Sequence, residues 1–209
     1  MRLWTAIKMA IVLTLLTGIA YPLAMVAFAN LLFPTQAQGS LISRDGQVVG
    51  AVPIGQNFTS ARYFHGRPSA AGEKGYDASN SGGSNLGPTN KALIEAVRSR
   101  VRALREAEPG LKHGEIPVDL VTASGSGLDP EITPAAAEIQ VARVAKARGL
   151  SKEAVRALIR AHTRGRLAGL LGEPGVNVLE LNMALDRHYP PSPPAADRPP
   201  RGSFSGGRG

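Results

Sequence analysis

Cysteine is absent from the 209-residue sequence, so the chain can form neither disulfide bonds nor thiolate metal sites. Histidine is also scarce, and its four residues are far apart. None belongs to an H-x-x-x-H pair, the spacing that brings two imidazoles to one helix face to bind zinc. The four are His65, His113, His162 and His188. The sequence therefore predicts no metal site.

Aromatic residues make up only 5% of the chain, although it is basic, with 24 Lys and Arg against 16 Asp and Glu and a net charge of +8. Such an excess can indicate binding to nucleic acid, anionic lipid or an acidic protein. Its arginines follow helix faces, as in Arg98, Arg102 and Arg105 or in Arg156 and Arg160. No aromatic residues interleave with them as a base-stacking platform requires. We interpret these faces as solvated and expect no nucleic-acid partner.

Motifs for nucleotide binding and for serine hydrolysis are missing from residues 119–130, DLVTASGSGLDP, which otherwise resemble a phosphate-binding loop. A P-loop requires a lysine, and none lies between positions 112 and 146. The dinucleotide pattern G-x-G-x-x-G also fails. Asp129 lies two residues after Gly127 and places a negative charge where a phosphate would bind. The hydrolase pattern G-x-S-x-G fails because position 122 is Thr. A turn that also contacts a partner is favoured over a turn alone and over small-ligand binding.

Around this loop the residues predict a strand followed by a helix. Ile116 to Val121 are apolar and β-branched enough for a short buried strand. Asp129 then suits a helix N-cap, because Pro130 at the first helical position needs no acceptor for an N-H. Ser124 to Gly127 would form the loop between them, since glycine permits positive φ and close backbone approach.

Charge is missing from residues 9–43, and residues 9–33 are almost wholly apolar. Twenty-five residues make about 37 Å of helix, which is long enough to span a bilayer core of about 30 Å. A cleavable signal peptide is the alternative, because Ala27 and Ala29 fit its small-x-small pattern, but its apolar region would be shorter. The sequence thus predicts a membrane anchor. Pro22 is expected to kink it.

The orientation of this anchor follows from the charges that flank it. Arg2 and Lys8 precede the apolar run, whereas the first basic residue after it is Arg44. Positive residues are retained on the cytoplasmic side. We therefore expect residues 1–8 in the cytoplasm, a transmembrane helix at 9–33 and an extracytoplasmic domain at 34–188.

The domain is expected to be α+β. Asp45-Gly46 predicts the turn of a β-hairpin over residues 40–49, and the Gly, Ser and Asn of residues 78–88 predict a loop. Apolar spacing, caps and stops predict helices at 92–107, 134–147, 152–162 and 178–187. Residues 189–209 are rich in Pro, Gly and Arg and predict a disordered tail.

Several unusual short motifs occur in one order along residues 1–188. They are Tyr21-Pro22-Leu23, Ile54-Gly55-Gln56 with Phe58, Arg67-Pro68-Ser69, Ser81-Gly82-Gly83-Ser84-Asn85 with Gly87-Pro88, Asp119 through Pro130, Gln140 with Arg143-Val144-Ala145, and Val176-Asn177-Val178-Leu179 with Leu181-Asn182. In this ordered set the chain resembles the C subunit of the Kdp potassium-transporting P-type ATPases, a small bacterial protein with a single membrane helix. The tail beyond Tyr189 matches nothing in that family.

The resemblance implies an inner-membrane complex with a channel-like potassium-binding subunit, a P-type ATP-hydrolysing subunit and a small single-helix subunit. The chain lacks the Asp-Lys-Thr-Gly phosphorylation motif, so it would be an accessory, non-catalytic subunit. The family also implies a catalytic chaperone role that raises the ATP affinity of the pump subunit through Ser-Gly-Gly. No other cofactor is implied. The predicted topology places this motif outside the cell, where ATP is scarce.

The Ser/Gly loops and the adjoining acid are the candidate contacts with a partner. They comprise Ser81, Gly82, Gly83, Ser84, Asn85, Ser124, Gly125, Ser126, Gly127 and Asp129. A function of another class also fits these loops, namely a membrane-tethered extracytoplasmic ligand-binding protein or hydrolase. A stand-alone enzyme of that kind would be active without membrane partners, whereas an accessory subunit would co-purify with them.

Overall fold

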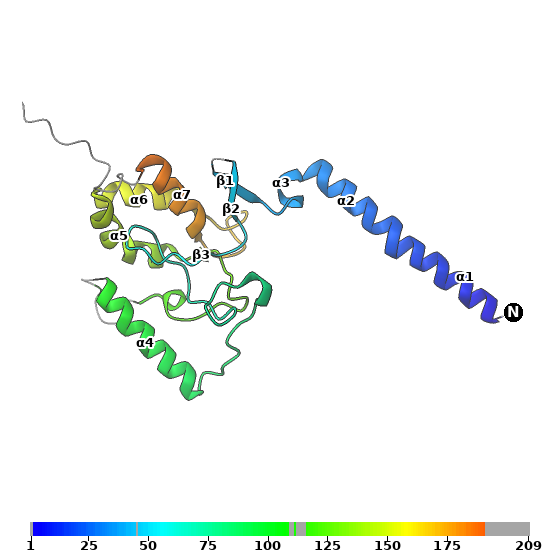
Figure 1. The fold of residues 1–209 in the computed structure, drawn as a ribbon, viewed down its shortest axis with the longest axis horizontal. Coiled ribbons are helices and arrows are strands. Elements are labelled where there is room, and N and C mark those ends of the chain that lie inside the picture. Colours follow the sequence, from blue (N-terminus) through cyan, green and yellow to red (C-terminus); the bar gives the residue numbers. More distant parts are fainter. Residues whose placement is uncertain (1, 45, 109–110, 112–115, 191–209) are drawn as a thin grey trace, which may run out of the picture.

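A computed structural model describes residues 2–44, 46–108, 111 and 116–190. It joins an isolated N-terminal helix to a domain of helices and two small sheets (Figure 1). Asp45 and the predicted tail from residue 191 onward fall outside the described residues. The mixture of helix and sheet confirms the α+β prediction for the described part.

The N-terminal helix runs without interruption over Arg2–Leu32 and extends away from the domain (Figure 1). It comprises α1 (Arg2–Leu15), a π-helical stretch η1 (Leu16–Ala20) and α2 (Tyr21–Leu32), and none of its residues is buried. The π-helical stretch ends at Ala20, two residues before Pro22, which has no N-H to bond the preceding turn. Its length and composition suit a membrane span. The kink at Pro22 stays a prediction.

After the short helix α3 (Pro34–Ala37), the chain forms the predicted hairpin. Strands β1 (Leu41–Arg44) and β2 (Gln47–Ala51) are antiparallel, and Arg44 faces Gln47. Gly46, in the turn between the two strands, has φ +78°. This left-handed conformation is what the Asp-Gly pair predicts.

Three helices and a three-stranded antiparallel sheet form the helical half of the domain, residues 131–188. The helices are α5 (Pro134–Arg148), α6 (Lys152–Ala161) and α7 (Val178–His188). The strands are β3 (Glu131–Ile132), β4 (Thr163–Arg164) and β5 (Gly175–Asn177), in the order β3-β5-β4. Side chains of Thr133, Ser151 and Asn177 cap the three helices, and Gly149 ends α5 with φ +69°. The three predicted helices are confirmed.

The core lies mainly within this helical half. Its fully buried apolar residues include Val141, Val144, Val155, Val176, Leu181 and Leu185. Phe64 enters the same cluster from a loop outside the helical half. This interior supplies the hydrophobic stabilisation that the short strands cannot provide alone.

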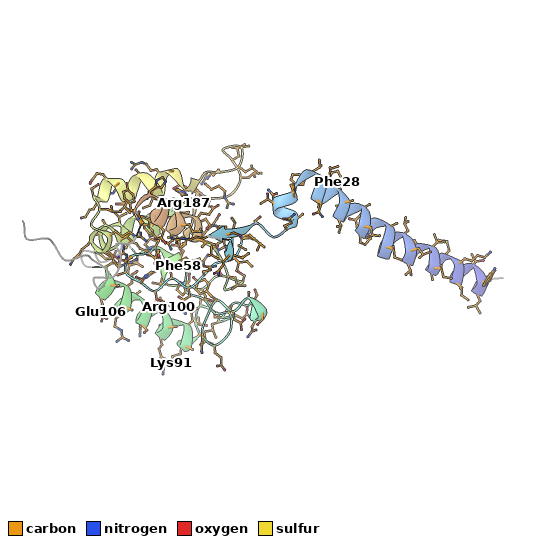
Figure 2. All side chains as sticks on the ribbon, turned by 45° about the horizontal axis from the view of Figure 1, so that its top comes forward. Phe28, Phe58, Lys91, Arg100, Glu106 and Arg187 are labelled. Carbon is orange, nitrogen blue, oxygen red and sulfur yellow. The ribbon has the colours of Figure 1, made fainter. Side chains whose placement is uncertain are left out.

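Helix α4 (Lys91–Ala107) stands apart from the other helices, with the loops of the domain between them (Figures 1 and 2). The predicted helix is confirmed, and Asn90 is its N-cap, accepting from the N-H of Ala92 at 2.9 Å. None of its residues is fully buried. The connecting loops contain two 3-10 turns, η2 (Ala78–Asn80) and η3 (Val118–Leu120).

Two predictions around residues 116–130 are wrong. Where a strand was expected, the chain forms the 3-10 turn η3. Just after it, the Thr122 N-H and hydroxyl both donate to the Val118 carbonyl, at 2.9 and 2.8 Å. This turn directs the buried side chain of Asp119 toward Thr133. Asp129 is not a helix cap, because strand β3 follows it and α5 begins only at Pro134, capped by Thr133.

Candidate functional site

The two Ser/Gly loops, far apart in sequence, lie against each other. Gly82 donates its N-H to the Ser126 carbonyl at 2.9 Å, and the Ser81 hydroxyl donates to the same oxygen at 3.0 Å. A Cβ on Gly83 would lie 3.0 Å from the Gly125 carbonyl. We call residues 81–85 and 124–127 together the Ser/Gly surface. The structure thus brings both groups of predicted contact residues together.

Glycine is required at position 127 by both conformation and space. Gly127 has φ +67°, and a Cβ there would lie 2.7 Å from the Ala71 nitrogen and from the Gly82 carbonyl oxygen. A real Cβ atom essentially never lies so close to a backbone atom, so any larger residue would displace a loop. The close approach that the sequence predicted for this glycine is confirmed.

A third segment, residues 69–76, holds these loops in place. The Ser69 hydroxyl donates to the Gly127 carbonyl at 2.6 Å and accepts from the N-H groups of Ala71 and Tyr76, at 3.1 and 2.7 Å. Sequence reasoning noted Ser69 only as part of the Arg67-Pro68-Ser69 motif. Its role in joining residues 69–76 to the loop at 124–127 depends on contacts that no local pattern reveals.

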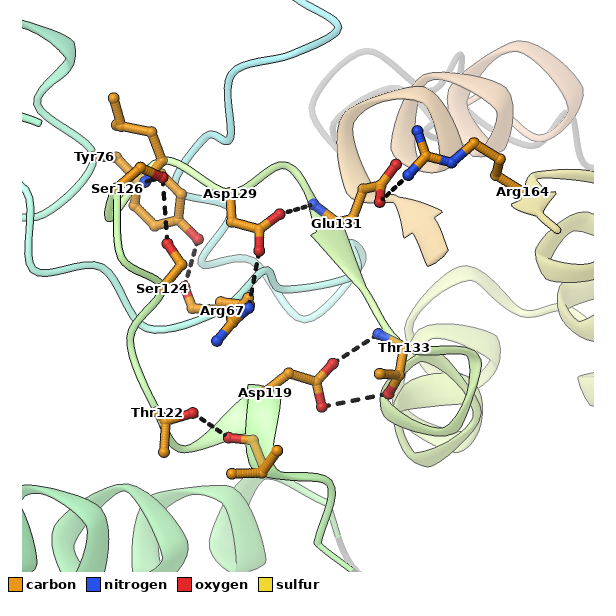
Figure 3. Close-up of polar contacts among 12 residues, drawn as sticks. Arg67, Tyr76, Asp119, Thr122, Ser124, Ser126, Asp129, Glu131, Thr133 and Arg164 are labelled. Carbon is orange, nitrogen blue, oxygen red and sulfur yellow. Dashed lines mark hydrogen bonds and ion pairs between the residues drawn. The ribbon is translucent and has the colours of Figure 1, made fainter. Parts of the chain in front are cut away.

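Asp129 forms an ion pair at the edge of the Ser/Gly surface (Figure 3). One carboxylate oxygen accepts from Arg67 Nη1 at 2.9 Å, and the other accepts from the Glu131 N-H at 3.0 Å. The two side chains are 30% and 24% exposed, so the pair is partly screened by water. Asp129 therefore fixes the path of the chain into β3 and keeps an accessible negative charge.

Tyr76 lies beside this pair and donates its hydroxyl to the Arg67 carbonyl at 2.5 Å (Figure 3). Burial and the nearby charge of Asp129 together raise the pKa of Tyr76 to about 12, although the charge of Arg67 opposes them. The phenol is therefore a neutral donor at all physiological pH values. It positions the backbone that carries Arg67.

Asp119 connects the Ser/Gly surface to the helical half (Figure 3). Its carboxylate accepts from the Thr133 N-H at 2.7 Å and from the Thr133 hydroxyl at 3.3 Å. The same hydroxyl accepts from the Ala136 N-H at 3.1 Å, which completes the N-cap of α5. The capping role predicted for an aspartate at this loop thus belongs to Thr133, supported by Asp119.

A second polar cluster fixes residues 60–65 on α5. Gln140 accepts from the His65 N-H at 2.7 Å and donates to the His65 carbonyl at 3.1 Å, while Arg143 donates to Glu108 at 2.6 Å. Burial lowers the pKa of His65, and the charge of Arg143 lowers it further. Burial also raises the pKa of Glu108, against the effect of its hydrogen bond from Arg143. These contacts are structural, and sequence reasoning identified Gln140 and Arg143 only through the family motif.

The hydroxyls of the Ser/Gly surface take part in turns. Ser126 accepts from the Leu128 N-H at 3.1 Å, and the Ser124 hydroxyl lies 3.5 Å from that of Ser126. Ser124 is buried, whereas Ser84 and Asn85 are exposed. Within the described residues, no group of three His, Asp or Glu side chains could hold a metal ion. The residues of the Ser/Gly surface are uncharged, and Asp129 lies at the edge of this surface in its ion pair with Arg67.

Comparison with known proteins agrees with the ordered motifs. The family model for the C chain of K+-transporting ATPases, KdpC, matches residues 3–187. Among curated relatives, the potassium-transporting ATPase KdpC subunit of Rhodopseudomonas palustris is 58% identical over 87% of this chain and 95% of its own length. The subunits of the same name from Polaromonas naphthalenivorans and Sorangium cellulosum are 59% and 60% identical over 90% and 87% of this chain, and over 96% and 95% of their own lengths. The chain therefore belongs to the KdpC family of potassium-transporting ATPase subunits.

Proposed function

We propose that the chain is an accessory, non-catalytic subunit of a high-affinity, ATP-driven potassium uptake complex in the bacterial inner membrane. Its partners would be a potassium-binding channel-like subunit, a P-type ATP-hydrolysing subunit and a small single-helix subunit. The names of the relatives support a potassium-transporting ATPase. The missing Asp-Lys-Thr-Gly motif supports a role other than phosphoryl transfer.

The helix over Arg2–Leu32 would anchor the chain with its N-terminus in the cytoplasm and its domain outside. The charge difference supports this orientation, since Arg2 and Lys8 precede the apolar core and Arg44 follows it. Because the chain has no cysteine, Ser43→Cys supplies a unique label. An impermeant thiol reagent should label it in intact cells whose outer membrane is permeabilised. Labelling that requires inner-membrane lysis would reverse the orientation.

The Ser/Gly surface would dock on the potassium-binding subunit. The observation that carries this proposal is the direct pairing of the two loops through Gly82 and Ser126 beside the accessible Asp129. Glycine-rich backbones let a partner approach closely, and a preformed surface loses little conformational entropy on binding. Ser84 and Asn85, exposed at the rim, are the residues that we expect to meet the partner.

Co-purification of the tagged full-length chain from membranes tests the docking surface. Ser84→Arg places a large charged side chain on the Ser/Gly surface, and Ser99→Arg makes the same change at an exposed position of α4. We expect Ser84→Arg to lose the partner subunits and Ser99→Arg to retain them, with equal thermal unfolding of both variants. Retention of partners by Ser84→Arg, or equal loss by both, would place the contact elsewhere.

The chain would act on ATP affinity only through its partners. The Ser81 and Ser126 hydroxyls already make hydrogen bonds within the domain, and the proposed topology puts the Ser-Gly-Gly segment on the side opposite to cytoplasmic ATP. The purified full-length chain is therefore expected to bind ATP weakly or not at all. A micromolar dissociation constant by calorimetry, about 8 kcal/mol of binding free energy, would contradict this expectation. Hydrolysis of ATP or simple esters by the isolated chain would favour a membrane-tethered hydrolase.

A further inference from the structure

A leucine-rich loop projects from the sheet between β4 and β5. All ten residues of 164–173 are exposed, which sets this segment apart from the buried strand that follows. Leu167, Leu170 and Leu171 are 73%, 82% and 67% exposed. Leu170 is the most exposed large apolar side chain among the residues that the structure describes. Single exposed leucines scattered over a surface are ordinary. Three on one short turn form an apolar cluster of the kind that marks a binding surface.

This loop is a defined turn. Leu167 donates its N-H to the Leu171 carbonyl at 2.8 Å, and Leu171 donates its N-H to the Leu167 carbonyl at 3.0 Å. Between them Ala168 has φ +52°, a left-handed conformation that costs a residue with a Cβ about 1–2 kcal/mol. Arg166 also holds both carboxylate oxygens of Glu173, at 2.9 and 2.8 Å. The turn therefore presents its leucines to the outside in a fixed conformation.

A membrane surface is the occupant that the rest of the chain favours. The apolar helix ends at Leu32, and β1 begins only nine residues later at Leu41, so the domain is tethered close to the bilayer. Strand β5, which follows the loop, is joined to the β1–β2 hairpin region by the bond from Asn177 Nδ2 to the Val52 carbonyl, at 2.8 Å. The loop therefore belongs to a sheet that is connected directly to the membrane-proximal hairpin.

The charges near the leucines also suit a lipid headgroup layer. Arg164 is 71% exposed, and Arg160 lies beside the base of the loop, where it lines a hollow with Gly165 and Pro174. The whole chain carries a net charge of +8. Apolar side chains flanked by arginines bind bilayer interfaces, because the apolar groups enter the acyl boundary and the cations meet anionic headgroups.

We propose that Leu167, Leu170 and Leu171 insert into the interfacial region of the membrane as a second lipid contact beside the N-terminal helix. This contact would fix the tilt of the domain over the membrane. It goes beyond the proposed docking surface and holds for either orientation of the helix, since each leaflet presents the same kind of interface.

Depth-dependent fluorescence quenching tests the insertion on the full-length chain. The chain has no cysteine, so Leu170→Cys and, as a control, Ser99→Cys on exposed α4 each carry one environment-sensitive label. Both proteins are reconstituted into vesicles of phosphatidylcholine and phosphatidylglycerol. We expect brominated acyl chains to quench the label at position 170 and aqueous iodide to quench the label at 99. Adding Leu167→Ser and Leu171→Ser should abolish most of the acyl-chain quenching at position 170.

Three outcomes would overturn the proposal. The first is quenching of the Leu170→Cys label by iodide to the same extent as the control label. The second is protection that appears only when the other transporter subunits are present, which would assign the leucines to a protein pocket. The third is protection that rises with the ratio of protein to lipid, which would assign them to a second copy of the chain.

Discussion

The domain contains two regions with different sources of stability. The helical half, residues 131–188, holds 14 of the 18 buried apolar side chains among the described residues. The loop half, residues 53–90 and 116–130, contributes only Phe64, Ala71, Leu120 and Val121 to the buried apolar set. It has no strand and only two short 3-10 turns within its described residues. Polar contacts therefore contribute much of what holds the loop half in place, beside the few apolar side chains that it buries.

Those polar contacts run from the helical half to the backbone of the loops. Asn182 accepts from the Phe64 N-H at 2.8 Å and donates to the Phe64 carbonyl at 2.9 Å, and Gln140 does the same for His65. In the opposite sense, a side chain of the loop half, Asp119, accepts a hydrogen bond from the backbone N-H of Thr133 in the helical half. The difference shows that side-chain amides and carboxylates hold the loop half on the helical half, where regular secondary structure is missing.

The largest expected effect is in the helical half. Leu181 is 0% exposed, so Leu181→Ala leaves a cavity in the core and should lower the free energy of unfolding by about 2–5 kcal/mol. Denaturant unfolding of the full-length chain in detergent, followed by circular dichroism, measures the change. Val118→Ala, at a position that is 68% exposed, is the control and should change stability by less than about 0.5 kcal/mol. Similar values for both would contradict the location of the core.

The neighbouring residue tests the polar attachment of the loop half. Asn182 is 1% exposed, and Asn182→Ala leaves the Phe64 N-H and carbonyl without their partner. Each buried unsatisfied group costs about 1–3 kcal/mol, and we expect a total of about 2–3 kcal/mol because the loop can relax toward water. Hydrogen exchange should rise mainly around residues 60–66. A uniform rise across α5 and α7 would show that the two regions do not differ.

Two glycine variants test how closely the loops of the Ser/Gly surface pack at position 127. Gly127→Ala adds a Cβ that meets two backbone atoms at 2.7 Å in a left-handed conformation, and it should cost at least about 1–2 kcal/mol. Gly125→Ala has open space around its Cβ and is the matched control. Thermal unfolding of the two variants measures the difference. Equal melting temperatures would mean that residues 71 and 82 move freely away from position 127.

The same contrast explains what the sequence could predict. Helices α4 to α7 and the β1–β2 hairpin follow from periodicity, caps and one Asp-Gly turn, all of which are local signals. Asp129-Pro130 and Thr133-Pro134 both show the N-cap signature, and local rules cannot choose between them. Pairing of Ile132 with Val176 extends the chain as a strand and so leaves Thr133 as the cap.

The candidate site was predictable only in part. The Ser/Gly composition identified both loops, but their contact joins Gly82 to Ser126 across 44 residues and follows from no spacing rule. The strand expected at 116–121 failed because Asp119 is drawn to Thr133, and the backbone turns to allow it. Arg67 was visible in a family motif, yet nothing in the sequence indicated its ion pair with Asp129.

The stability of the loop half should depend on pH in the alkaline range, because Tyr76 ionises there. Tyr76→Phe removes a hydrogen bond to the Arg67 carbonyl and should cost about 0.5–1.5 kcal/mol at neutral pH. The folded-state pKa is about 12 against an ordinary 10.0, so the contribution is complete below pH 10 and is lost as the pH rises toward 12. The advantage in free energy of unfolding that the unmodified protein has over Tyr76→Phe should therefore shrink as the pH rises from 8 to about 12. A constant difference would show that the phenol ionises normally.

The smallest expected effect on stability separates the structural and contact roles of Asp129. Asp129→Asn retains an oxygen that accepts from the Glu131 N-H and loses the charge that pairs with Arg67. Partly exposed ion pairs contribute about 0.2–1 kcal/mol, so the variant should remain folded. If the carboxylate meets a positive group or an ion pathway on the potassium-binding subunit, complex assembly or growth at limiting potassium will fail although the thermal unfolding is nearly unchanged.

Glu131 provides the matched control, because its carboxylate is 27% exposed and pairs with Arg164 at 2.8 Å, much as that of Asp129 is 30% exposed and pairs with Arg67 at 2.9 Å. Glu131→Gln removes the same charge two residues away, outside the Ser/Gly surface. We expect it to support full growth at limiting potassium and Asp129→Asn to impair it. Equal growth of both variants would leave Asp129 with the structural role alone, as the residue that holds Arg67 and the entry to β3.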